Sequence, residues 1–185
     1  MRYHLARAGD LTALVSPPYD VIPEPELERY RTRSPYNVIR LIRPGTDYDG
    51  AGATFDQWTR DGILEADPPS MYVHEVSFGG RRRRDLIAAL RLQPYEDRVV
   101  LPYERTHRGP KEDRLALLRA TNVSLEPLWF TYEGRGAGLS NILDAVTARA
   151  AAVAFEGPEG TKHRLWTVSD PALHAAVHAA MSDLP

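Results

Sequence analysis

The chain has 185 residues and no cysteine, so it has no disulfides, thiolate nucleophiles or cysteine-type zinc sites. Its net charge is near −2, so it has no globally basic surface for nucleic acid. Its apolar share of 43% and charged share of 26% are those of an ordinary globular protein. The first residues lack the apolar core of a secretory signal and no apolar tract is long enough to cross a membrane, which predicts a cytoplasmic protein without a membrane partner or a nucleic-acid partner.

Short apolar runs alternate with proline and glycine in the first third of the chain. Pro25 suits the first turn of a helix, and the β-branched pair Val38-Ile39 favours a strand. The predicted elements are a strand at residues 13–15, a helix at 24–31, a strand at 37–42 and a helix at 50–61.

The rest of the chain continues the alternation of strands and helices. We expect a hairpin of strands 71–78 and 85–92, a helix at 112–120, a strand at 125–132, a helix at 140–150, strands at 152–155 and 163–168, and a helix at 171–181. The order predicts an α+β fold with a mixed, largely antiparallel sheet flanked by helices. We expect a single domain over residues 1–185.

Two patterns look like known motifs without meeting their requirements. Gly79-Gly80 precedes four arginines, but a phosphate loop needs a terminal Lys-Ser/Thr and a following helix, so Arg81–Arg84 is interpreted as an exposed turn. His174 and His178 have metal-ligand spacing, but the sequence HAAVH lacks the glutamate of a metalloprotease helix. No metal site is predicted from either pattern.

The segment LPYERTHRGPKEDRLALLRAT, residues 101–121, has the densest set of polar groups. Such groups on a turn that leads into a helix N-terminus are typical of anion and phosphate sites. Glu104 is a candidate acid, base or metal ligand and Asp113 a supporting residue, while the candidate anion-binding residues are Arg105, Arg108, Lys111 and Arg114. The alternative is structural: Asp113 stabilises the helix dipole and Arg114 pairs with a nearby glutamate.

A second candidate is the proline-restricted turn SPPYDVI at residues 16–22. Asp20 is a candidate general base or magnesium ligand with Tyr19 in support, although a rigid turn capped by Asp20 is an equally open interpretation. The sequence SPYNVIR at residues 34–40 repeats the pattern and adds Tyr36 and Asn37 as supporting candidates.

Four motifs occur along the chain in this order: SPPYDVI, SPYNVIRL, YDGAGATFDQWTRDGIL and LPYERTHRGPKEDRLALLRAT. By these motifs the chain resembles the uncharacterised bacterial and archaeal family named domain of unknown function 1015. The resemblance implies two departures. Family members have His-Glu where this chain has Tyr103-Glu104, and they are about twice as long, with an Ala-Asp-Gly-His-His-Arg box beyond the last helix of this chain. We therefore expect the chain to be the N-terminal portion of a longer architecture.

The missing box is similar to the phosphate-binding element of the ParB, sulfiredoxin and free-serine-kinase group. By that likeness the chain is expected to be part of a nucleotide- or phosphate-binding, phosphotransferase-like protein that is inactive alone, with a nucleotide and magnesium as candidate cofactors. The alternative is a non-catalytic interaction or assembly module, whose partner is a C-terminal half or another protein. The first hypothesis requires Asp20, Glu104 and the arginines to lie around one cleft.

Overall fold

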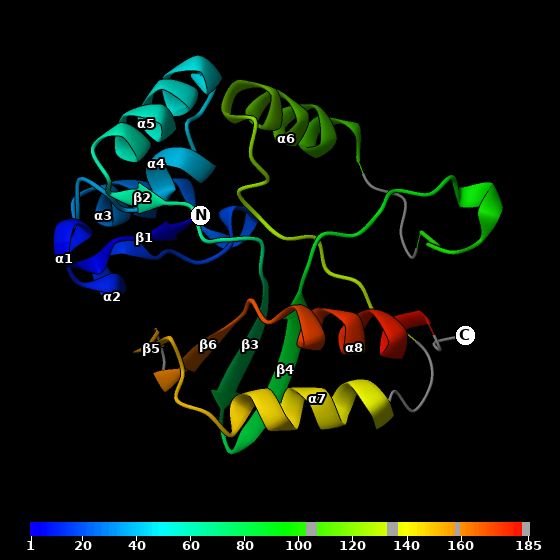
Figure 1. Ribbon diagram of the computed structural model, residues 1–185. Helices are drawn as coiled ribbons and strands as arrows, with labels where there is room; N and C mark the ends of the chain where they lie inside the picture. Colours follow the sequence, from blue (N-terminus) through cyan, green and yellow to red (C-terminus); the bar gives the residue numbers. More distant parts are fainter. Residues whose placement is uncertain (103–106, 133–136, 158–159, 183–185) are drawn as a thin grey trace. The chain divides into compact units, whose positions relative to one another are not determined.

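The computed structural model describes residues 1–102, 107–132, 137–157 and 160–182 (Figure 1). The chain forms two compact units, and each unit is built from two separate stretches of sequence. The first contains Met1–Ala66 and Arg91–Pro127, and the second contains Asp67–Leu90 and Leu128–Pro185. Helices and two antiparallel sheets are present, so the α+β prediction is confirmed.

The first unit is mainly helical and has one small sheet, in which β1 (Arg2–Tyr3) pairs antiparallel with β2 (Leu64–Glu65). Its longer helices are α5 (Tyr48–Arg60) and α6 (Arg108–Thr121). Its short helices are α1 (Leu5–Ala8), α2 (Leu11–Leu14), η1 (Tyr19–Val21), η2 (Glu24–Glu26), α3 (Leu27–Arg31), α4 (Ile39–Ile42) and η3 (Tyr95–Asp97).

Two groups of buried side chains hold the first unit together. One is centred on Phe55 and Trp58 of α5, and the other on Leu27, Tyr30 and Ile39 of α3 and α4. The predicted helices at 24–31 and 50–61 are confirmed, the first as η2 followed directly by α3.

Both strands predicted in the first third of the chain are wrong, because each segment forms a helical turn. Asp10 caps α2 by accepting the Thr12 N–H at 3.0 Å. The Asn37 side-chain oxygen accepts the Ile39 N–H at 3.0 Å, which starts α4. In runs this short the apolar pattern does not separate a helix from a strand, and the hydrogen bonds accepted by Asp10 and Asn37 favour the helical turns.

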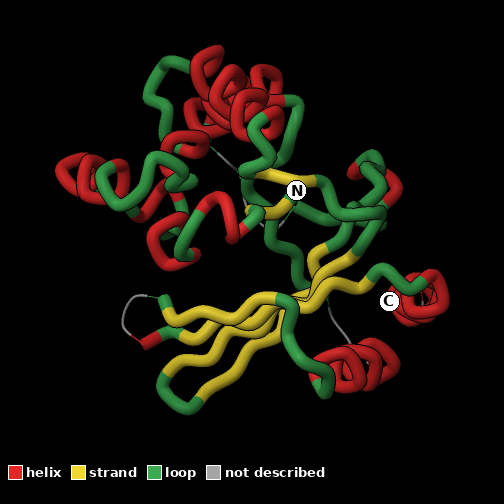
Figure 2. The backbone as a smooth tube through the Cα atoms, turned by 60° about the vertical axis from the view of Figure 1, so that its left-hand side comes forward, coloured by secondary structure: helices red, strands yellow, loops and turns green. Residues whose placement is uncertain are grey.

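The second unit contains a four-stranded antiparallel sheet in the order β4-β3-β6-β5. Its strands are β3 (Met71–Phe78), β4 (Arg81–Ile87), β5 (Val153–Glu156) and β6 (Lys162–Val168). Helices α7 (Ala137–Thr147) and α8 (Pro171–Ser182) pack beside each other on one face of the sheet (Figure 2). Val73 and Trp166 are cross-strand neighbours on this face and are buried under the helices. The predicted hairpin, the last two strands and both helices are confirmed in type, with shifted ends.

Glu75 lies on the same face of the sheet as Val73 and has a fully buried side chain. Its carboxylate accepts hydrogen bonds from Arg84, at 2.8 Å, and from Arg164, its register partners on β4 and β6. Burial alone would raise the pKa of Glu75, but these two hydrogen bonds outweigh it and the pKa lies below its ordinary value. The expected turn at Gly79-Gly80 is present and Arg81, Arg82 and Arg83 are exposed, but the arginines belong to β4 and Arg84 neutralises a buried carboxylate.

Residues 125–132, predicted as a strand, form no strand pairing in the described structure and are largely exposed. Pro127 removes one backbone donor from this segment, which disfavours a sheet ladder. No helix of the described residues is long and apolar enough to cross a membrane.

Candidate functional site

The turn at residues 16–22 lies against α6. Pro17 and Pro18 restrict the backbone that leads into η1. The Tyr19 ring lies beneath the Arg114 guanidinium, with 3.9 Å between the guanidinium carbon and the ring centroid. The Glu126 carboxylate accepts the Tyr19 N–H at 3.4 Å. The chain thus brings two of the polar motifs seen in the sequence to one place.

Arg114 uses all five of its N–H donors within the protein. Nε and Nη2 donate to the Asp113 carboxylate at 2.8 and 2.5 Å, and Nη1 donates to Glu126 at 3.1 Å. Nη1 and Nη2 also donate to the Ile42 carbonyl at 3.1 Å. The charge of Arg114 is therefore balanced by two carboxylates, and the hydrogen bonds to any ligand must come from other groups.

A hollow of about 380 Å³ opens beside Arg114. It is lined by Tyr19, Glu24, Leu27, Arg31, Arg43, Pro44, Gly45, Gly109, Pro110, Asp113 and Arg114. Gly109 and Pro110 belong to the first turn of α6, whose N-cap residue His107 makes no side-chain capping hydrogen bond in the described structure. A helix N-terminus that lies beside two further arginines favours an anion.

The two carboxylates beside Arg114 have opposite pKa shifts. Burial raises the pKa of Glu126, with a further contribution from the Asp20 charge, and this outweighs the lowering by Arg114 and the Tyr19 N–H. Burial would also raise the pKa of Asp113, but hydrogen bonds from Tyr48, at 2.7 Å, and from Arg114 bring it below its ordinary value. Glu126 is thus the carboxyl of the pair that is better placed to gain a proton.

With this geometry established, comparison with known proteins places the chain in a family. The family model described as Protein of unknown function (DUF1015) matches residues 1–185. The chain belongs to the DUF1015 family. No curated protein and no solved structure matches it.

In this DUF1015 chain some of the predicted site residues line the hollow and others do not. Tyr19, Asp113 and Arg114 line the hollow, and Asp20 is an exposed neighbour whose charge acts on Glu126. Arg108 and Lys111 are exposed on α6 outside the lining, and Arg108 donates to Glu112 at 2.7 Å. Glu104 and Arg105 lie outside the described residues.

Tyr36 and Asn37 have structural contacts in the described chain and do not line the hollow. The Asn37 amide is fully buried and donates to the carbonyls of Ala13 and Val15, at 2.7 and 3.1 Å. Tyr36 packs edge-on against Trp58 with 5.8 Å between the ring centroids. Asn37 therefore ties α2 to α4.

Sequence reasoning missed Arg31 and Arg43, which line the hollow of this DUF1015 chain, and Glu126, which binds Arg114. Arg43 donates to Glu24 at 3.1 Å, and Arg31 donates to the Arg43 carbonyl at 3.2 Å. Glu126 was not considered as a site residue because it lies in residues 125–132, which were predicted to form a strand. Arg43 had one usable signal, since it directly precedes the Pro44-Gly45 turn of this sequence.

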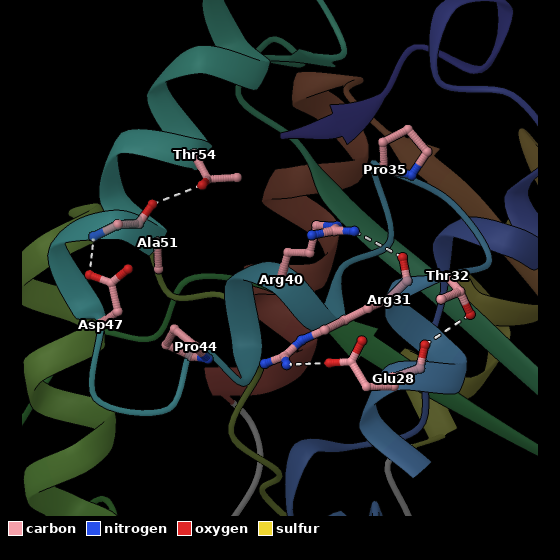
Figure 3. A pocket seen from close by; sticks show the side chains of 10 residues that line it. Glu28, Arg31, Thr32, Pro35, Arg40, Pro44, Asp47, Ala51 and Thr54 are labelled. Atoms are coloured by element: carbon pink, nitrogen blue, oxygen red, sulfur yellow. Dashed lines mark hydrogen bonds and ion pairs between the residues drawn. The ribbon is translucent and has the colours of Figure 1, made fainter. Parts of the chain in front are cut away.

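A second, wider hollow of about 750 Å³ lies on the other side of Arg31 and Pro44, which line both hollows. Figure 3 shows its walls: Glu28, Arg31 and Thr32 from the α3 region, Arg40 from α4, and Asp47 and Thr54 from α5. None of the predicted catalytic residues that the structure describes lines it.

No group of three His, Asp or Glu side chains among the described residues is arranged to hold a metal ion. Asp113 and Glu126 are instead bound to Arg114. Both carboxylates are therefore engaged by the same guanidinium.

Proposed function

We propose that the chain is the anion-binding part of a phosphotransferase-like protein, and that its ligand is a nucleotide or another small phosphorylated molecule. The observation that carries this proposal is the hollow beside Arg114, where the turn at residues 16–22 meets the first turn of α6. Two motifs far apart in sequence supply the charge and the backbone donors that phosphate sites use.

Arg43 is the residue best placed to donate to the phosphate. Its partner Glu24 has an 80% exposed side chain, and exposed ion pairs contribute only about 0–1 kcal/mol. A phosphate can therefore replace Glu24 at little cost. Arg31 adds a second guanidinium to the lining, and the α6 N-terminus adds N–H groups.

In this proposal Asp20 is the general base. Glu126 accepts the Tyr19 N–H and so positions the turn on which Asp20 lies. Glu104 keeps its proposed acid, base or metal-binding role, and Arg105, Arg108 and Lys111 theirs as anion-binding residues. Burial raises the pKa of Glu126, so this carboxyl is able to take up a proton when an anion binds nearby.

Thermal-shift and calorimetric titration with phosphate, ADP and ATP, each with and without magnesium, test the proposal. Arg43→Ala is expected to weaken binding about tenfold, whereas Arg29→Ala, on an exposed part of α3, leaves it unchanged. Asp20→Asn should bind the ligand with little change. Wild-type protein that binds none of these probes would rule the proposal out.

A second candidate function, an interaction module, has one observation in its favour. Leu128, Trp129, Phe130 and Tyr132 are all exposed, with 79% of Leu128 and 65% of Trp129 accessible to solvent. Consecutive exposed aromatic and aliphatic residues are typical of interaction sites. Sedimentation velocity should then show self-association of the wild type, and the double variant Trp129→Ser/Phe130→Ser should abolish it. A wild type that stays monomeric at every concentration would show that this segment does not mediate self-assembly.

A further inference from the structure

Three arginines on and beside α3 and α4 are linked in a row through backbone carbonyls. Arg40 Nη2 donates to the Arg31 carbonyl at 2.9 Å, and Arg31 Nη2 donates to the Arg43 carbonyl at 3.2 Å. Arg43 Nη2 donates to Glu24. Main-chain acceptors thus fix the guanidinium groups of Arg40 and Arg31, which reduces the entropy lost when a ligand binds them.

This row runs from one hollow to the other. Arg43 lines only the smaller hollow beside Arg114, Arg40 lines only the wider one, and Arg31 lines both. The wider hollow therefore adjoins the candidate anion site, and the two share Arg31 and Pro44 as lining residues.

Charge pairing in the wider hollow leaves one cation available. Arg31 pairs with Glu28 at 2.7 Å, and Asp47 accepts the Gly50 N–H at 3.0 Å as the cap of α5. Arg40 has only the Arg31 carbonyl as a partner, and no carboxylate of the described residues pairs with it. Figure 3 shows the Arg40 side chain on the wall between the α5 residues and Arg31. Arg40 is therefore the cation of this hollow that can pair with an anionic group of a ligand without displacing a carboxylate.

We propose that the ligand is an elongated small molecule with an anionic group at each end, one bound at Arg43 and the other at Arg40. This inference rests on the proposed function, because it places the first anionic group in the hollow beside Arg114. Arg31 lies between the two groups, where its charge is already paired with Glu28. Two linked groups bind more tightly than one because the second binds at a high effective concentration.

Inorganic oligophosphates of increasing length test the proposal without knowledge of the natural ligand. Calorimetric titration with phosphate, diphosphate, triphosphate and tetraphosphate is run on the wild type and on Arg40→Ala, Arg43→Ala and Arg29→Ala. We expect wild-type affinity to rise in one step at the length that reaches Arg40. Arg40→Ala should lose that step, about tenfold for the longest probe, and bind phosphate like the wild type.

Arg29→Ala removes the same charge from an exposed position outside both hollows and is the matched control. If Arg40→Ala binds tetraphosphate as tightly as the wild type while Arg43→Ala does not, the elongated ligand is wrong and the proposed function stands. If Arg29→Ala lowers tetraphosphate affinity as much as Arg40→Ala does, long-range charge explains the effect and the inference fails. If Arg43→Ala leaves phosphate binding unchanged, or the wild type binds no probe, the proposed function fails and the inference fails with it.

Discussion

The Arg114 guanidinium carbon lies 3.9 Å from the centroid of the Tyr19 ring, and this contact joins helix α6 to the turn at residues 16–22. Because every N–H of Arg114 is already bonded to Asp113, Glu126 or the Ile42 carbonyl, its place beside the ring is fixed. The residue with the most contacts in the candidate site is thus the one least able to rearrange for a ligand. Arg114 therefore forms a fixed part of the hollow that Arg31 and Arg43, which are more exposed, also line.

Arg114→Ala is expected to destabilise the protein by about 2 kcal/mol, because the Asp113 and Glu126 carboxylates lose their counter-charge and the Ile42 carbonyl loses its donor. Arg108→Ala, which removes only an exposed pair with Glu112, should cost about 0.3–0.5 kcal/mol. Urea unfolding of both variants gives the comparison. Equal losses would show that Arg114 is a surface charge and not the centre of the site.

The elements that the sequence predicted correctly are those with a clear periodicity or a clear turn. The strand at 71–78 alternates and is followed by Gly79-Gly80, both with positive φ, so the hairpin could be predicted from local chemistry alone. The segment around Ile39 failed because it is too short: Ile39, Leu41 and Ile42 are buried while Arg40 is exposed, a pattern that a strand and a single helical turn share. Asn37 was a usable signal there, since its side chain begins the helix.

The candidate site was predicted in part. Tyr19, Asp113 and Arg114 lie together, but the pairing of Arg114 with Glu126 depends on how the chain returns after α6, which no local pattern encodes. The same limit applies to Glu75. The alternating sequence of β3 does not indicate that the Glu75 side chain is buried. The strand register places Arg84 and Arg164 beside it, and the register depends on the fold.

Glu75→Gln is expected to cost about 3 kcal/mol at neutral pH, because the buried carboxylate that balances Arg84 and Arg164 is lost and Arg84 keeps only Asp144 among the described carboxylates. The pKa of Glu75 is lowered in the folded state, so its stabilising contribution is present above the ordinary value of 4.5 and is lost as the pH falls below it. The difference between wild type and variant should therefore shrink as urea unfolding is repeated at pH values below 4.5. Glu156→Gln, an exposed change on β5, is the control. A difference that stays constant with pH would contradict the ion pairing of Glu75.

Gly52→Ala is expected to destabilise the first unit by about 1–3 kcal/mol, because a Cβ at this position of α5 would lie 2.5 Å from the Ala120 carbonyl oxygen of α6. Gly138→Ala is a matched control in α7, where the new Cβ would lie 3.6 Å from the Ala180 Cβ, an ordinary contact. Alanine is favoured over glycine within a helix by about 0.5–1 kcal/mol, so Gly138→Ala should stabilise slightly. Thermal unfolding of both variants tests the close approach of α5 and α6, and equal effects would refute it.

His74 and His163 form a hydrogen-bonded pair across β3 and β6, with 3.2 Å between His74 Nε2 and His163 Nδ1. One ring must donate and the other accept, so protonation of both replaces the bond with repulsion. Burial lowers the pKa of both residues. The His163 charge lowers that of His74 further, and Asp85 opposes this effect at 3.8 Å while Arg83 adds to it.

Because the folded-state pKa of each histidine lies below the ordinary value of 6.5, their contribution to stability is present above that pH and is lost as the pH falls through it toward the folded pKa. His163→Phe removes one titrating group and keeps an aromatic ring against Phe155, whose ring lies 4.7 Å from that of His163 between centroids. The variant should therefore lose less stability than the wild type when urea unfolding is carried out at pH values below 6.5. Imidazole resonances that titrate at or above 6.5, or equal pH slopes for the two proteins, would show that the pair does not make the sheet sensitive to acid.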